Sequence, residues 1–196
     1  MSENIIYIII SPIIIILILV LIFYSSKKKI DALKELSTFL NGTVSKYYFT
    51  PTFIGEYQGL KFSISLVAGS NTTPLYLIIS LFKNSFFRLS IYKESIYFLL
   101  DLGKKFGILN RVKTTDEMFD REFLIFSNKP TEVMFYLNNM SIKNTIRELF
   151  NNGFNAIIID GKKIIIKKEN CVLRRDLQQE NLIGVLQRLS LLAKTL

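Results

Sequence analysis

The longest uninterrupted apolar stretch of the chain covers residues 5–24, which read IIYIIISPIIIILILVLIFY. The stretch holds no charged residue, and only Ser11 and Pro12 interrupt its apolar character. Twenty residues in an α-helix span about 30 Å, the thickness of the hydrocarbon core of a bilayer. The pattern therefore predicts an N-terminal transmembrane helix, with residues 1–29 as the anchor and its basic flank and residues 30–196 as a separate folded domain.

Three lysines follow this apolar run directly. They are Lys27, Lys28 and Lys29, and no Lys or Arg precedes the run. Because cytoplasmic flanks carry an excess of basic residues, we expect a single-pass protein of the cell membrane with its N-terminus outside and its C-terminal domain in the cytoplasm. The three lysines are predicted to contact the anionic membrane surface. A cleaved signal peptide is disfavoured, because the run lacks a basic leader and no small-x-small cleavage site follows it.

Helical spacing continues after the lysines, where Ile30, Leu33, Leu36 and Leu40 recur on one face before Asn41-Gly42. This pattern predicts an amphipathic helix that ends at the Asn-Gly pair. The helix is expected either to continue the transmembrane helix, to lie on the lipid headgroups, or to pack on its own domain. Packing on the domain is the favoured interpretation.

The first half of the domain alternates apolar and polar residues as β-strands do. Pro51, Gly55 and Gly59 predict a turn region, with a bulge or turn at a strand start, and residues 69–74 a loop. Lys83-Asn84-Ser85 is predicted to be a hairpin turn between two neighbouring strands. The predicted strands are Thr43–Tyr48, Leu60–Val67, Leu75–Phe82 and Phe86–Tyr92, with a further short strand at Glu122–Ser127.

The second half mixes helices with one hairpin. Residues 95–107 fit a strand or a short helix, and residues 108–121 are predicted to be irregular. Pro130 is expected to open a helix to about Asn138, and Ser141 to cap a second helix that ends near Asn151.

Asp160-Gly161 predicts a hairpin between the strands Ala156–Asp160 and Lys162–Lys168. Asp176 is expected to cap the last helix, with Gln179 completing a capping box. This order of strands, helices, hairpin and helix predicts an α+β fold, a mainly antiparallel sheet packed by helices.

The amino-acid composition excludes several kinds of catalytic and metal-binding site. The chain has no histidine and a single cysteine, Cys171. Histidine-based acid–base catalysis, a Ser-His-Asp triad and a thiolate zinc site are therefore excluded. No other pattern supplies a catalytic residue, a cofactor site or a metal site, so we expect a protein that is not an enzyme and has no cofactor.

The domain is basic. All 25 Lys and Arg and 15 of the 16 Asp and Glu follow residue 26, so this part of the chain has a formal charge of +10. Such a balance suits anionic lipid or nucleic acid, or simply keeps the domain soluble beside a negative leaflet. The basic residues Lys162, Lys163, Lys167, Lys168, Arg174 and Arg175 carry no interleaved exposed aromatics, so nucleic acid is disfavoured.

Asp116, Glu117, Asp120 and Glu122 form the densest carboxylate cluster. Such oxygens could hold Mg²⁺ or Ca²⁺, although the spacing does not match an EF-hand. The favoured interpretation is a solvated loop whose acids are neutralised by the nearby residues Arg111, Lys113 and Arg121.

Two short segments resemble a known family when they are taken together. The first, Gly55-Glu56-Tyr57-Gln58-Gly59-Leu60-Lys61-Phe62, resembles a G-x-Y-x-G-x-[KR] pattern. The second, Thr115-Asp116-Glu117-Met118-Phe119-Asp120-Arg121-Glu122-Phe123, resembles an F-D-x-x-F pattern. Their order and spacing are similar to those of an uncharacterised family of bacterial membrane-anchored proteins. The resemblance supplies no activity, and it implies only that Gly55, Gly59, Phe119, Asp120 and Phe123 shape the fold or a shared surface.

These observations predict a single-pass, membrane-anchored, non-enzymatic binding or scaffold module, or an accessory subunit of a membrane complex with a protein partner. An alternative is a domain that reads anionic lipid headgroups through its basic face. A carboxylate-metal hydrolase built on residues 116–122 is the least favoured interpretation.

Overall fold

A computed structural model covers residues 1–196 and describes residues 2–45, 50–67, 75–93 and 110–196. Within the first helix it describes the side chains of residues 14–17, 20, 23 and 24, and those from residue 26 on. The predicted loop at 69–74 and the ambiguous segment at 95–107 lie outside the described residues. In chain order the helices and strands are α1 Ser2–Glu35, a short 3-10 turn Leu36–Thr38, β1 Gly42–Ser45, β2 Thr52–Tyr57, β3 Leu60–Val67, β4 Tyr76–Phe82, β5 Leu89–Lys93, β6 Asn110–Arg111, α3 Glu117–Glu122, β7 Phe123–Ser127, α4 Pro130–Leu137, α5 Met140–Asn151, β8 Ala156–Ile159, β9 Lys163–Lys168, α6 Leu173–Asp176 and α7 Gln179–Lys194.

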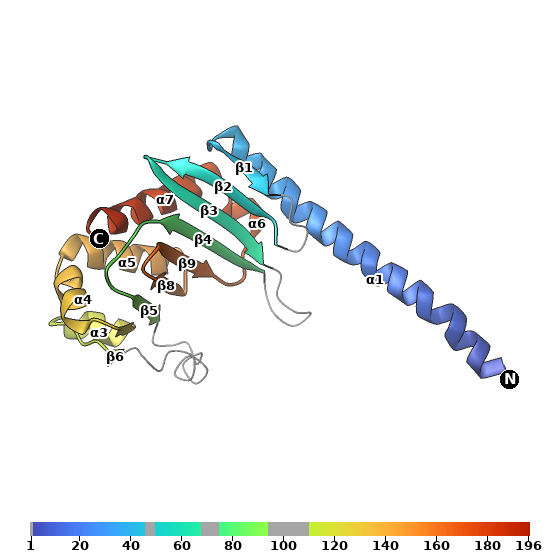
Figure 1. Ribbon diagram of the computed structural model, residues 1–196, viewed down its shortest axis with the longest axis horizontal. Helices are drawn as coiled ribbons and strands as arrows, with labels where there is room; N and C mark the ends of the chain where they lie inside the picture. The colour runs from blue at the N-terminus through green and yellow to red at the C-terminus, as the bar shows by residue number, and fades with distance from the viewer. Residues whose placement is uncertain (1, 46–49, 68–74, 94–109) are drawn as a thin grey trace.

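The strands of the described residues form one sheet in the order β1-β2-β3-β4-β9-β8-β5-β7-β6. Every neighbouring pair is antiparallel. Helices α5 and α7 lie together behind this sheet, and α1 projects away from the domain as a long rod (Figure 1). The predicted α+β fold with a large antiparallel sheet is therefore confirmed.

One face of the sheet forms the core. Successive residues of a strand point to opposite faces, so every second residue can be buried. In β3, for example, Phe62, Ile64 and Leu66 are fully buried, whereas Ser63 and Ser65 are only half-buried. One row of paired residues crosses seven strands and consists of large apolar side chains: Phe53, Ile64, Ile79, Ile166, Ile157, Ile91 and Ile125.

The two long C-terminal helices complete this core. In α5 the buried residues Ile142, Ile146 and Leu149 recur at helical spacing. In α7 the predicted apolar face is buried as well, through Leu182, Val185, Leu186, Leu189 and Leu192. The hydroxyl of the buried Tyr136 in α4 donates to the Leu192 carbonyl oxygen at 3.1 Å, so α4 is also tied to α7. Burial raises the pKa of this tyrosine.

Helix α1 continues without a break from the apolar run into the domain. It packs against β1 and β2, and Leu33, Leu36 and Leu40 join the hydrophobic core. Packing on the domain, the favoured outcome for this segment, is therefore confirmed, and the segment is continuous with the helix of the apolar run. Among the helical residues whose side chains are described, no stretch is long and apolar enough to cross a membrane. Most of residues 5–24 lie outside those residues.

The predicted turn region at Pro51–Gly59 is mostly wrong, because Thr52–Tyr57 forms strand β2, which pairs with β3 over its whole length. Two glycines obscured this strand in the sequence. Gly55 lies inside β2, where a Cβ atom would stand 2.6 Å from the Asn41 carbonyl oxygen and 2.8 Å from the Phe62 ring. Only Gly59 serves a turn, since Gln58 and Gly59 have φ values of 51° and 76°, as a tight hairpin requires.

The predicted hairpin at Lys83-Asn84-Ser85 is also wrong, because β4 and β5 do not pair. The backbone N–H groups of Lys83 and Ser85 donate instead to the carbonyl oxygens of Lys162 and Gly161. The chain thus passes the turn of the β8–β9 hairpin, which inserts between β4 and β5. A segment of three polar residues between two apolar runs is long enough for a hairpin turn. A local pattern cannot show, however, that the two strands formed by residues 156–168 lie between β4 and β5.

Three local predictions near helix ends need correction. Residues 108–121 are not wholly irregular, since they hold β6 and the start of α3. The cap of α5 is Asn139, whose side chain accepts from the Ser141 N–H, so Ser141 is not the cap. Helix α7 begins at Gln179 after Gln178, and Asp176 belongs to the preceding turn α6 instead of a capping box.

We predict that Gly55→Ala destabilises the domain by about 1–3 kcal/mol, because the new methyl group would overlap the Asn41 carbonyl and the Phe62 ring. Chemical denaturation of the detergent-solubilised full chain would measure the loss. Gly59→Asn is the matched control, because position 59 has open space and a left-handed backbone that Asn tolerates. Equal losses for the two variants would contradict the close approach at Gly55.

Candidate functional site

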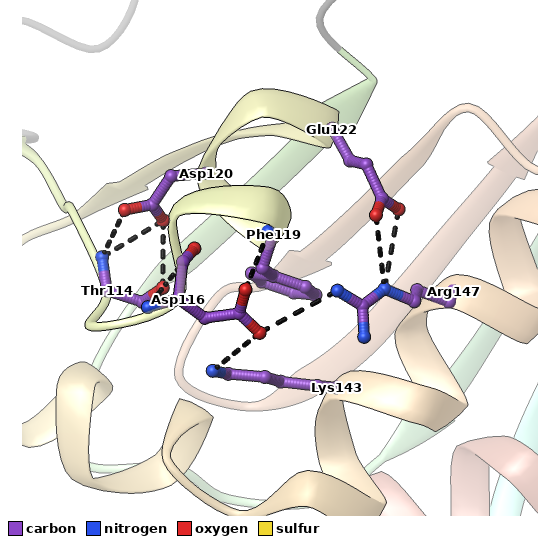
Figure 2. Close-up of polar contacts among 7 residues, drawn as sticks. All are labelled: Thr114, Asp116, Phe119, Asp120, Glu122, Lys143 and Arg147. Carbon is purple, nitrogen blue, oxygen red and sulfur yellow. Dashed lines mark hydrogen bonds and ion pairs between the residues drawn. The ribbon is translucent and has the colours of Figure 1, made fainter.

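The acidic cluster predicted from the sequence lies on and beside α3, against α5 (Figure 2). Asp116 is the N-cap of α3, and its Oδ1 accepts from the Phe119 N–H at 3.0 Å. This bond satisfies one of the N–H groups that a helix start leaves without a partner. The first acid of the cluster therefore has a structural role in beginning the helix.

Asp116 also pairs with two cations from α5. Its Oδ2 lies 3.2 Å from Lys143 Nζ and 3.7 Å from the Arg147 guanidinium. The Lys143 side chain is only 4% exposed, so this carboxylate compensates a buried positive charge. Arg147 reaches Glu122 as well, at 3.4 Å (Figure 2). The cluster is therefore an ion-pair network between α3 and α5.

Asp120 serves the loop before α3. Its two carboxylate oxygens accept from the Thr114 N–H at 3.0 and 2.8 Å, and its Oδ1 accepts from the Thr114 hydroxyl at 2.9 Å. Glu117 has only a weak pairing with Arg121, at 3.7 Å, and both side chains are more than four-fifths exposed. A pair of that kind contributes little stability.

An aromatic cluster lies beneath the acids. Phe119 is fully buried, and Lys143 and Arg147 lie 5.5 and 5.2 Å from its ring centroid. Phe123 packs on Phe119 and on Phe150 of α5, with centroids 4.8 and 4.7 Å apart. The two cations are thus held between a carboxylate and an aromatic face, which fixes α3 against α5.

This geometry does not favour a metal site. Three of the four carboxylates already bind α5 cations or backbone and hydroxyl donors. In the described part of the chain, no group of three or more Cys, Asp or Glu residues is arranged to hold a metal ion. Of the neutralising residues expected from the sequence, Arg121 pairs with Glu117. Lys143 and Arg147 supply the rest, and their distance along the chain hid them from sequence reasoning.

The same contacts set the protonation of Asp116. The hydrogen bond from the Phe119 N–H, followed by that from Lys143, holds the pKa of this carboxyl below its ordinary value of 3.8. A lowered pKa in the folded state means that the carboxylate stabilises the fold above pH 3.8. This contribution is lost as the pH falls below that value.

We predict that Asp116→Asn lowers the melting temperature at pH 7, because it leaves the buried Lys143 ammonium without its nearest carboxylate, whereas the amide oxygen of Asn can still cap α3. The difference from the wild-type chain should shrink as the pH is lowered from 3.8 toward the lowered pKa of the folded chain, below which Asp116 itself is protonated. Thermal unfolding across a pH series would measure both effects. Glu117→Gln is the control, and it should change the melting temperature little because that acid is exposed. A pH-independent difference for Asp116→Asn would contradict this assignment.

A second polar site surrounds Asp176, whose side chain is 4% exposed. Its Oδ1 accepts from Lys168 Nζ at 3.1 Å and from Arg175 Nε at 3.0 Å, and its Oδ2 accepts from the Val172 N–H at 2.9 Å. Burial alone would raise the pKa of Asp176, but the bonds from Arg175, Val172 and Lys168 outweigh it, so that the pKa is lowered. Lys168 and Arg175, two of the basic residues noted in the sequence, are therefore paired with Asp176 within the fold.

Cys171 lies beside this carboxylate. The thiol is buried, and burial, followed by the negative charge of Asp176, raises its pKa to about 12. A thiol of this kind stays protonated at neutral pH and is a poor nucleophile. Cys171 lies three residues after the end of β9.

We predict that Asp176→Asn destabilises the fold by about 2–4 kcal/mol, because it removes the charge that compensates the largely buried Lys168 ammonium. Denaturant unfolding of the full chain would measure the loss. The exposed Glu180, at the start of α7, provides the control Glu180→Gln, expected to stay within about 0.5 kcal/mol of the wild-type chain. Asp176→Asn behaving like this control would contradict the role of the carboxylate.

The three lysines predicted at the membrane surface do not share one environment. Lys27 and Lys28 are exposed, whereas Lys29 is buried, and burial lowers its pKa. Lys27 and Lys28 line a groove of about 660 Å³ between α1 and the segment 173–179 that contains α6. No local pattern in the sequence predicts this groove, because its walls come from residues 24–39 and 173–179, near opposite ends of the chain.

Comparisons with known proteins show a shared fold. No protein-family model matches the chain, and no curated protein matches it. The resemblance to an uncharacterised bacterial family therefore stays a prediction. Among solved structures, the chain is similar to the crystal structure of the mycobacterial trehalose monomycolate transport factor A, TtfA, with a TM-score of 0.60 and 7% sequence identity. The match covers 87% of this chain and 95% of that chain. At this identity the likeness concerns the fold alone.

Proposed function

We propose that the chain is a membrane-anchored, non-enzymatic accessory or scaffold subunit of a membrane complex. The observation that carries this proposal is the continuity of α1, which joins the apolar residues 5–24 to the core residue Leu33 in one helix. The sheet shares its fold with a protein named as a transport factor, and that likeness supports an accessory role.

The orientation of the chain in the membrane is part of this proposal. Residues 5–24 would cross the membrane once, with residues 1–4 outside and residues 30–196 as the cytoplasmic domain. The basic residues Lys27, Lys28 and Lys29 support this orientation, because they follow the apolar run on one side only.

The residue chemistry supports a binding role over catalysis. The sequence lacks histidine, and the carboxylates that might bind a metal are engaged with Lys143, Arg147 and Thr114. Exposed apolar side chains are available for a protein partner, among them Phe135 and Met140 near the α4–α5 corner.

We predict that the full-length chain stays in the membrane fraction after alkaline carbonate extraction and, in mild detergent, retains a membrane-protein partner in fixed proportion. Mass spectrometry of the purified material would identify and quantify that partner. Replacing Ile14 and Leu17 with Lys should release the chain from the membrane, since each charge near the centre of a spanning helix costs about 2.5–3.5 kcal/mol.

The matched control replaces the exposed residues Thr43 and Gln187 of the domain with Lys, which should change neither extraction nor partner recovery. Release of the wild-type chain by carbonate would contradict the anchor. A chain that remains embedded but is always recovered alone would contradict the accessory role.

A further inference from the structure

The groove at the base of α1 joins the two ends of the chain. One wall is the side of α1 that carries Tyr24 and Lys28, continued by the turn that follows the helix. The other wall is the segment around α6 and the start of α7. The complete lining is Tyr24, Lys27, Lys28, Asp31, Ala32, Glu35, Thr38, Phe39, Leu173, Arg174, Leu177, Gln178 and Gln179.

Positive charge gathers at the end of the groove nearest the apolar run. Lys27 and Lys28 lie within one helical turn of Tyr24, the last residue of that run. The two acids of the lining, Asp31 and Glu35, lie one and two turns further along α1, and Asp31 pairs with Lys34 at 3.9 Å. Among the described residues, no carboxylate oxygen lies within 4.0 Å of the charged groups of Lys27, Lys28 or Arg174. These three cations can therefore take an external anion.

The groove also has an apolar wall. Ala32, Phe39 and Leu173 are half-buried residues that pack against the core, and Leu177 belongs to the core itself. Tyr24 also lines the groove and is 69% exposed. Cations at one end and apolar side chains along the walls match an amphiphile with an anionic headgroup better than they match a free phosphate ion.

We propose that this groove binds one anionic phospholipid of the leaflet that the domain faces. Lys27, Lys28 and Arg174 contact the headgroup phosphate, and Tyr24, Phe39 and Leu173 cover the glycerol and the upper part of an acyl chain. The inference rests on the proposed function, because only an anchor at residues 5–24 holds the groove at the depth of the headgroups. It assigns to this site one bound lipid, in addition to the general attraction between a basic surface and a membrane.

The test is a lipid titration of the full-length chain in mild detergent, read by native mass spectrometry. Phosphatidylglycerol should bind in a single saturable step and more tightly than phosphatidylcholine, and the preference should weaken as the salt concentration rises. The variant Lys27→Gln/Lys28→Gln/Arg174→Gln should bind phosphatidylglycerol about tenfold more weakly or worse, since each cation near an anionic headgroup contributes about 1 kcal/mol.

Two further variants separate the groove from net charge. Lys61→Gln/Lys113→Gln/Lys162→Gln removes the same charge from exposed positions outside the groove and should leave the affinity unchanged. Leu173→Gln keeps every charge, alters the apolar wall, and should weaken phosphatidylglycerol binding. Glycerol phosphate, which has the same phosphate chemistry without acyl chains, should fail to compete at equal concentration.

The outcomes are distinguishable from those of the proposed function. Equal losses of phosphatidylglycerol affinity in the two triple variants would show that only net charge matters, and this would contradict the proposed site. Competition by glycerol phosphate would overturn the lipid in favour of a soluble anion. Neither of these results bears on the membrane anchor, which carbonate extraction tests separately. Release of the wild-type chain by carbonate would contradict the anchor whatever the lipid titration shows.

Discussion

The sheet depends on the insertion of one hairpin. Strands β8 and β9 pair with each other and, on their outer edges, with β5 and β4. Without residues 156–168 the sheet would be two separate halves, β1–β4 and β5–β7. The hairpin supplies Ile157, Ile159, Ile164 and Ile166 to the buried face, and all four are at most 1% exposed. The hydrophobic core becomes continuous only when this late segment is in place. The assembly of the sheet therefore requires contacts between distant parts of the chain, which is slow to achieve because loop closure precedes the gain.

The helix layer is held to the far end of the sheet by charge as well as by apolar packing. Lys143 projects from the buried side of α5, where an unpaired ammonium would be costly to desolvate. Asp116 offsets part of that cost, because its carboxylate is held by the cap of α3 at a position 3.2 Å from Lys143 Nζ. Phe119, on the next turn, presents its ring to the same cation. A cluster that reads as an acidic surface in the sequence is therefore a joint between α3 and α5.

Patterns within a few residues predicted the structure well, and pairings across the chain were out of their reach. The alternation of Leu60–Val67 matches β3, and Asp160-Gly161 forms the expected hairpin turn, in which Gly161 has a φ of 94°. Gly55 misled the interpretation of β2, because its function is to admit the Asn41 carbonyl and the Phe62 ring, neither of which is visible in a local pattern. Asp176 likewise had the spacing of a capping box, yet its partners include Lys168 from the preceding strand. At the candidate site, the sequence supplied the acids but not Lys143 and Arg147, which lie more than twenty residues further along.

Because α1 is continuous, the orientation of the domain is coupled to that of its first helix. Leu33 in α1 and Leu36 in the 3-10 turn that follows it are at most 1% exposed, so the helix cannot rotate about its axis without moving apolar surface out of the core. Lys29 is buried on the same side, four residues before Leu33, and so the contact extends toward the apolar run. Lys27 and Lys28, in contrast, do not lie on the packed side of α1 and are exposed. The packing that fixes α1 also determines which lysines face outward, and through them where a charged ligand can approach the domain.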